Sequence, residues 1–238
     1  MPALLNTVDP DGLEEFSVVF TDRSLNHMSQ AFQEVMRDIS GTLKAVYHAD
    51  AVALVPGGGT YGMEAVAGKP DLICIGEMGI GNTTSAAAIM AALTGLRVEQ
   101  CAGRGTGLDQ AGLNHKVDVI KAALELHQYQ NLSVPEIFRI FGGLEMAMMA
   151  GALLEAAQQQ VVVLVDGFIA SAVALACVKW FPNCRDYLIF CHQSDEQGHK
   201  LMLNYMEVEP LVDLNMRLGE GSGVAVAFPI IQSAVLFL

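Results

Sequence analysis

Two kinds of segment alternate along most of the chain. Short apolar runs at residues 71–76 (DLICIG), 161–166 (VVVLVD) and 186–192 (DYLIFCH) predict buried strands of the parallel type. Longer alanine-rich stretches at 82–95 and 167–181 predict helices. Strands that alternate with helices indicate an α/β fold, with helices flanking a parallel sheet in a Rossmann-like three-layer arrangement.

The first part of the chain has a different pattern. Residues 24–49 have apolar side chains at helical spacing and predict one long amphipathic helix. Residues 51–68 then predict a strand, a glycine-rich turn (PGGGT, 56–60) and a short helix start. The composition changes near residue 68. We therefore expect an N-terminal fragment of separate origin at 1–67 and an α/β domain at 69–238.

Composition narrows the classes of function. The 238-residue chain is 52% apolar and 16% charged, which is typical of a folded protein with a real core. Its net charge of −13 argues against nucleic acid as the main partner. The N-terminus has no basic region followed by an apolar one, and the 5 cysteines include no C-x-x-C pair. These features predict a cytoplasmic protein with reduced thiols.

Two apolar stretches resemble membrane spans in length. Residues 161–178 contain Asp166, and residues 222–238 contain Pro229. A carboxylate near the centre of a span is costly in lipid. We therefore expect the first stretch to be a buried strand, a turn at Asp166 and Gly167, and a buried helix, with no contact with a membrane.

The segment GEMGIGNTT (76–84) lies between a predicted strand and a predicted helix. Glycines such as Gly79 and Gly81 allow a ligand to approach the backbone, and the first N–H groups of the helix can hold a phosphate. A plain strand–helix turn with Asn82 or Thr83 as N-cap explains the pattern almost equally well.

Two further glycine clusters are ambiguous in the same way. GRGTGLD (103–109) precedes an amphipathic helix, and Arg104 and Lys116 are available there as cations; the alternative is a loop with solvated charges. GEGSG (219–223) places Glu220 between glycines before an apolar helix. Glu220 is then either a helix-capping carboxylate or a general base.

Other candidate features point to structure rather than chemistry. His192 and His199 flank QSDEQG without further ligands at tight spacing, so no metal site is predicted. Residues 141–156 carry Met and Leu at helical spacing and predict a core helix, with a close helix start at Gly142 and Gly143.

Taken together, the motifs from about residue 69 onward closely resemble the nicotinate-nucleotide–dimethylbenzimidazole phosphoribosyltransferase family. They occur in the family's order and with its spacing. The matching motifs are GEMGIGNTTSAAAI, GRGTGLD, HKVDVI, FGGLEMAMMAGA, VVLVDGFIASAVAL, HQSDEQGH and LNMRLGEGSGVAVAFPI.

The resemblance implies transfer of phosphoribosyl from nicotinate mononucleotide to 5,6-dimethylbenzimidazole, without a cofactor and in a homodimer. It implies that Glu220 is the general base and that Gly103, Gly105 and Lys116 hold the phosphate. The residues that it places elsewhere at the nucleotide are Glu77, Gly79, Gly81, Asn82, Thr83, Asp166 and Ser194.

Residues 1–67 resemble the N-terminal part of class V pyridoxal-phosphate aminotransferases, in which the PGGGTYGMEA turn (56–65) lies at the cofactor phosphate. No lysine of this chain lies in the context that a Schiff base requires. We also expect the phosphoribosyltransferase-like part to be truncated at both ends. Two alternatives to full activity therefore stay open: an inactive remnant that binds nicotinate mononucleotide, and an aminotransferase fragment.

Overall fold

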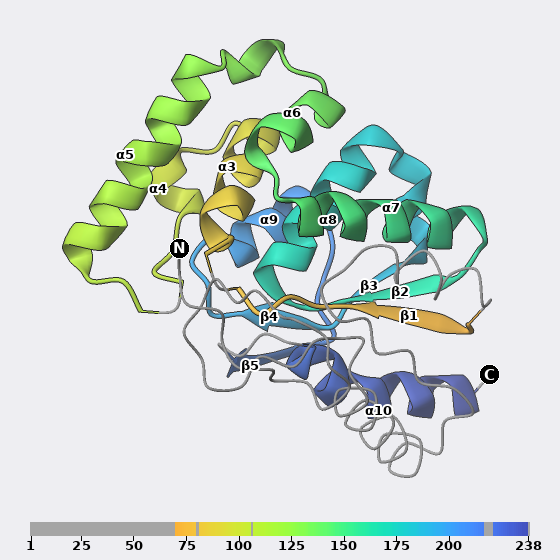
Figure 1. Cartoon of the computed structure of the whole chain (residues 1–238). Coiled ribbons are helices and arrows are strands. Elements are labelled where there is room, and N and C mark those ends of the chain that lie inside the picture. Colours follow the sequence, from red (N-terminus) through yellow and green to blue (C-terminus); the bar gives the residue numbers. More distant parts are fainter. Residues whose placement is uncertain (1–69, 80, 106, 217–220, 238) are drawn as a thin grey trace, which may run out of the picture. The chain divides into compact units, whose positions relative to one another are not determined.

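A computed structural model describes residues 70–79, 81–105, 107–216 and 221–237 (Figure 1). These residues belong to one compact unit that spans Val55–Leu238. The elements expected at 24–49 and 51–68, and the proposed domain at 1–67, lie outside the described residues.

The central sheet has three parallel strands in the order β1-β2-β3. They are β1 (Leu72–Ile75), β2 (Val162–Val165) and β3 (Leu188–Phe190). Leu72 of β1 pairs with Val162 of β2, and Val163 of β2 pairs with Leu188 of β3. The three predicted strands and their parallel arrangement are therefore confirmed, although each is shorter than its apolar run.

Successive side chains along the strands point to opposite faces of the sheet. They therefore pack into two apolar clusters, each covered by its own layer of helices. Ile75, Val163 and Val165 point into the larger apolar cluster, which contains α3 (Thr83–Thr94) and α8 (Gly167–Trp180). Leu164 points to the other face and packs with Val224 of α10 (Ser222–Leu236). Figure 1 shows α8 and α10 on opposite sides of the sheet, which confirms the three-layer expectation.

Alanine-rich sequence explains how the helices approach each other so closely. Helix α8 is buried at every position from Gly167 to Cys177, and it packs against α3 and α7 (Leu144–Gln158). The apolar stretch at 161–178 thus forms β2, a turn and α8, as predicted. No helix in the part of the chain that the structure describes is long and apolar enough to span a membrane.

The run at 186–192 does not continue as one strand, which corrects the prediction of a single strand to His192. The chain leaves the central sheet at Cys191, whose N–H donates to Val165 O while its carbonyl accepts from Val212 N–H. His192 then begins β4 (His192–Ser194), which pairs in parallel with β5 (Val212–Met216). An apolar run cannot reveal such a change of partner.

The remaining described elements are short helices, except for α5. They are α4 (Val98–Cys101), α5 (Gln110–Leu126), η1 (Tyr129–Asn131), α6 (Val134–Phe141), η2 (Pro182–Tyr187) and α9 (His199–Tyr205). Helix α5 contains the amphipathic helix that was predicted after GRGTGLD. All 5 cysteines are free thiols, as predicted.

Candidate functional site

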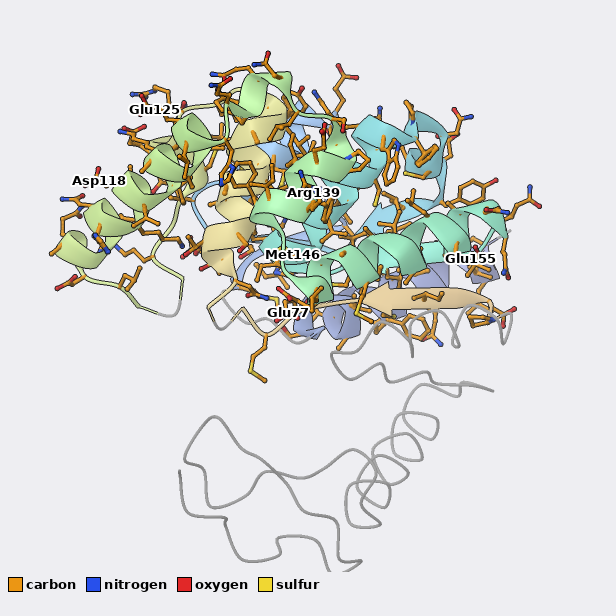
Figure 2. The ribbon with its side chains drawn as sticks, turned by 45° about the horizontal axis from the view of Figure 1, so that its top comes forward. Glu77, Asp118, Glu125, Arg139, Met146 and Glu155 are labelled. Atoms are coloured by element: carbon orange, nitrogen blue, oxygen red, sulfur yellow. The ribbon has the colours of Figure 1, made fainter. Side chains whose placement is uncertain are left out.

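The predicted polar segments lie where the parallel strands end. Residues 76–82 connect β1 to α3, Asp166 connects β2 to α8, and residues 195–198 connect β4 to α9. Figure 2 places Glu77 where the chain leaves β1. Ligands of open α/β sheets bind at this edge. A surface hollow of about 510 Å³, lined by Leu96, Arg97 and Lys121 among others, lies at the other end of α3 and contains none of the predicted site residues.

The first cluster joins two carboxylates through one amide. Asn82 Nδ2 donates to Glu77 Oε1 at 3.0 Å and to Glu145 Oε1 at 3.3 Å. Asn82 occupies the N-cap position of α3, but its side chain makes no capping hydrogen bond. Its Oδ1 atom is buried and has no hydrogen-bond partner among the described residues. The side chain of Asn82 therefore serves the cluster rather than the helix end.

Glu145 was missed by sequence reasoning. It lies in the first turn of α7, a segment that methionine and leucine spacing assigned to the core. Its sequence signal was its place within the motif FGGLEMAMMAGA, directly after Gly142, Gly143 and Leu144. Gly143 is the N-cap residue of α7, so the predicted close helix start is confirmed.

The second cluster is built around a buried cation. The Lys116 side chain on α5 is only 6% exposed, and its ammonium group donates to Thr83 Oγ1 and to Gly103 O, each at 3.0 Å. Burial lowers the pKa of Lys116, and the negative charge of Glu196 acts in the opposite direction. The structure thus brings Lys116 and Gly103, two of the residues predicted for the phosphate, together with Thr83.

Arg104, the other cation considered, is engaged in its own loop. Its guanidinium donates to Leu108 O and to Gln110 Oε1, both at 2.8 Å, and these contacts are exposed. The described contacts of Arg104 do not involve the residues around Lys116. The cation that the structure brings to this cluster is therefore that of Lys116.

The glycines of both turns have conformations or contacts that favour the absence of a side chain. Gly79 and Gly81 both have φ of +83°, in the left-handed region that favours glycine. A Cβ atom at Gly105 would lie 3.0 Å from Thr83 Oγ1, and one at Gly103 would overlap the Glu196 carboxylate. The positive φ favours glycine at Gly79, Gly81 and Gly105, whereas Gly103 leaves room for the Glu196 carboxylate.

The third cluster is centred on Asp166, which is 3% exposed. Its Oδ2 accepts from Gly221 N–H at 2.8 Å, and its Oδ1 accepts from Gly223 N–H at 2.9 Å. His192 Nδ1 lies 3.1 Å from Oδ1, but the alignment is not that of a hydrogen bond, and neither ring nitrogen of His192 has a hydrogen-bond partner among the described residues. Glu220, the predicted base, lies outside the described residues.

Ser194 and His199 organise the neighbouring turn. Ser194 N–H donates to His199 Nδ1 at 2.8 Å, and Ser194 Oγ accepts from Glu196 N–H at 3.3 Å. His199 Nε2 lies 2.9 Å from Ser171 Oγ. Burial, with a smaller effect of His192, lowers the pKa of His199 to about 3. His199 is therefore a neutral structural histidine; among the residues described, no group of three or more His, Cys, Asp or Glu could hold a metal.

A comparison with protein families matches residues 19–238 to a model described as "Phosphoribosyltransferase". A nicotinate-nucleotide–dimethylbenzimidazole phosphoribosyltransferase of Shewanella frigidimarina is 53% identical over 167 residues, which are 70% of this chain and 48% of that protein. The enzyme of the same name from Bradyrhizobium diazoefficiens is 51% identical over 170 residues, 71% of this chain and 49% of the relative. The chain thus spans about half the length of these curated relatives.

Solved structures agree with the sequence comparison. The crystal structure of CobT from Thermus thermophilus superimposes with a TM-score of 0.70 at 38% identity, covering 74% of this chain and 53% of that one. This identity is high enough for the similarity to concern more than the fold.

Proposed function

The chain belongs to the phosphoribosyltransferase family, and from that premise we propose that it transfers phosphoribosyl from nicotinate mononucleotide to 5,6-dimethylbenzimidazole. The products are α-ribazole phosphate and nicotinate, and the reaction belongs to the assembly of the lower ligand of cobalamin. The relatives from Shewanella frigidimarina and Bradyrhizobium diazoefficiens are named for this reaction, which supports the choice of substrates. No cofactor enters the proposed reaction.

One structural observation carries the proposal. The ammonium group of Lys116 is held by Thr83 and Gly103 at the strand edge, and the Thr83 hydroxyl lies close to the backbone of Gly105. A buried cation beside glycine N–H groups and a helix N-terminus is a suitable environment for the phosphate of a nucleotide. The turn between β1 and α3 then faces the rest of the nucleotide. It contributes Gly79, Gly81 and the Glu77–Asn82 pair.

The chemistry requires little acid catalysis. The bond between ribose C1′ and the nicotinate nitrogen breaks, and its electron pair returns to a ring that was already cationic. A nitrogen of the benzimidazole forms the new bond to C1′ and loses its N–H proton, which we assign to the carboxylate of Glu220. General-base assistance of this kind is typically worth about 10²–10⁴-fold in rate. The resemblance assigns Asp166 and Ser194 to the lining of the same site, and because both oxygens of Asp166 accept from backbone N–H groups of Gly221 and Gly223, we assign Asp166 to the positioning of the GEGSG turn.

A binding measurement and an activity measurement test the proposal together. Calorimetric titration of the full chain with nicotinate mononucleotide should show saturable binding, and addition of dimethylbenzimidazole should then release nicotinate. Binding without release would support the remnant hypothesis instead. Absence of binding would contradict both the enzyme and the remnant.

The proposal includes a cytoplasmic location and a homodimer. The absence of a membrane-spanning helix among the described residues is compatible with that location. Light scattering after size exclusion should give twice the chain mass of 25.4 kDa. A mass of one chain at micromolar concentration would contradict the dimer.

A further inference from the structure

A carboxylate of the protein lies where the proposed site is to receive phosphate. Glu196 Oε1 accepts a hydrogen bond from Gly105 N–H at 3.1 Å. The carboxylate also lies against Gly103, so closely that a Cβ atom at that position would overlap it. Gly103 and Gly105 are the two glycines that the proposed function assigns to the phosphate. Both therefore already face a negative group.

The charge of Glu196 is felt by the cation of the same subsite. The negative charge raises the pKa of Lys116 and so opposes the effect of burial. Lys116 and Glu196 together are close to neutral, whereas a phosphate monoester brings between one and two negative charges at neutral pH. Glu196 and a phosphate cannot both receive full stabilisation from one ammonium group and one backbone N–H.

The backbone at Glu196 is held independently of its carboxylate. Its N–H donates to Ser194 Oγ at 3.3 Å, and its carbonyl accepts from His199 N–H at 2.9 Å. Rotation of the side chain alone would therefore move the carboxylate away from Gly105 while the turn between β4 and α9 keeps its shape.

We propose that Glu196 is an internal anion that occupies the phosphate subsite until the nucleotide binds, and that it thereby sets the affinity of the site for phosphate. This inference rests on the proposed function for the identity of the nucleotide. It does not depend on that function for the exchange itself, which any phosphate ion can report. Glu196 is in this account a specificity-determining residue, and no role in the chemical step is assigned to it.

The test compares Glu196→Gln with the wild type by calorimetry. Glutamine keeps the shape of the side chain but removes its charge. The variant should bind inorganic phosphate and nicotinate mononucleotide roughly tenfold more tightly, because a like charge near the ligand is removed. Its affinity for nicotinate riboside, which lacks the phosphate, should stay within about twofold of the wild-type value, because the exchange concerns only the phosphate.

A matched control is available on α7. Glu155→Gln removes one charge from a half-buried residue whose carboxylate accepts an exposed hydrogen bond from Gln159, and Figure 2 shows Glu155 at the other end of α7 from Glu77. This variant should bind all three ligands as the wild type does. Equal gains in phosphate affinity for Glu155→Gln and Glu196→Gln would mean that the net charge of the protein causes the effect. This result would overturn the proposal.

The other outcomes are equally informative. Weaker binding of both the nucleotide and the riboside by Glu196→Gln would mean that Glu196 binds ribose hydroxyls, and unchanged phosphate affinity would mean that it does not compete; either result overturns the proposal. If the wild type binds phosphate but not the nucleotide, the proposed function fails while the phosphate comparison still decides the role of Glu196. Absence of phosphate binding in both proteins also overturns the inference.

Discussion

The carboxylate of Asp166 accepts a hydrogen bond from the backbone N–H of Gly221 at 2.8 Å. Gly221 follows Glu220 in the sequence, so this bond fixes the residue next to the proposed base. The second carboxylate oxygen accepts from Gly223, within the first turn of α10. Both oxygens thus have backbone partners, which favours a role for Asp166 in positioning the GEGSG turn over direct contact with a nucleotide.

Replacement of Asp166 by asparagine should separate positioning from binding. The amide oxygen can accept from only one of the two N–H groups, and its NH₂ group then faces the other. We expect the free energy of unfolding to fall by about 2 kcal/mol. Turnover should fall at least about tenfold, with the Kd for nicotinate mononucleotide within about threefold of wild type. Chemical denaturation, an assay of nicotinate release and calorimetry measure the three quantities; a large loss of nucleotide affinity would instead favour a direct contact.

Gly223 should not tolerate a methyl group. A Cβ atom there would overlap both His192 Nδ1 and Asp166 Oδ1, and all three groups are buried. We expect Gly223→Ala to lower the free energy of unfolding by about 1–3 kcal/mol or more through overpacking. Gly151→Ala is the matched control, because a Cβ atom at that position of α7 would have no neighbour within 4 Å beyond the adjacent backbone of its own helix.

The control has its own expected sign. Alanine replaces glycine inside a helix at Gly151, so Gly151→Ala should raise the free energy of unfolding by about 0.5–1 kcal/mol. Urea unfolding of the two variants measures both changes. Equal stability of the Gly223→Ala and Gly151→Ala proteins would contradict the packing described around Asp166.

Lys116 should matter for binding through its charge. Lys116→Met keeps the apolar stem in its buried position but removes the ammonium group that Thr83 and Gly103 hold. We expect the affinity for nicotinate mononucleotide to fall at least about tenfold, with little change for nicotinate riboside. Lys121→Met, on the same helix, removes a charge in an exposed pair with Glu99 and should bind as the wild type does. An equal effect of both substitutions would contradict the assignment.

His199 should make stability depend on pH. Its pKa is about 3 in the folded protein and near 6.5 in the unfolded chain. Between these values the unfolded state binds a proton that the folded state does not, so stability is lost as pH falls below about 6.5. The contribution of one group is about 1.4 kcal/mol per pH unit.

A histidine variant isolates this contribution from that of other groups. His199→Gln should show a smaller loss of unfolding free energy between about pH 6 and pH 4.5 than the wild type does. His115→Gln, at an exposed position of α5, should keep the wild-type slope. Identical slopes for His199→Gln and the wild type would mean that His199 is not held neutral.

The sequence predicted the parts of the fold that depend on local pattern. Apolar runs indicated β1 and β2, and alanine-rich segments indicated α3 and α8, because burial on both faces leaves a continuous apolar sequence. The break at Cys191 was not predictable, since a change of strand partner leaves the hydrophobicity of the run unaltered. The position of the break is set by hydrogen bonds between distant segments, in which Cys191 contacts Val165 and Val212.

The candidate site was predictable only in part. Lys116, Thr83 and Gly103 carry motif signals, and the fold brings the three residues into contact. Glu145 and Glu196 stand within the motifs FGGLEMAMMAGA and HQSDEQGH, but the motifs do not single them out, because their hydrogen-bond partners Asn82 and Gly105 lie 63 and 91 positions away in the sequence. Long-range partners of this kind are invisible in a single sequence.

The account depends most directly on Glu220 as the base of phosphoribosyl transfer. The decisive measurement is the rate of nicotinate release from nicotinate mononucleotide and dimethylbenzimidazole, by the wild type and by Glu220→Gln, with the Kd for nicotinate mononucleotide determined alongside. We expect release by the wild type and a loss of about 10²-fold or more in the variant, at unchanged nucleotide affinity and stability. Equal rates of release by the two proteins would contradict the account.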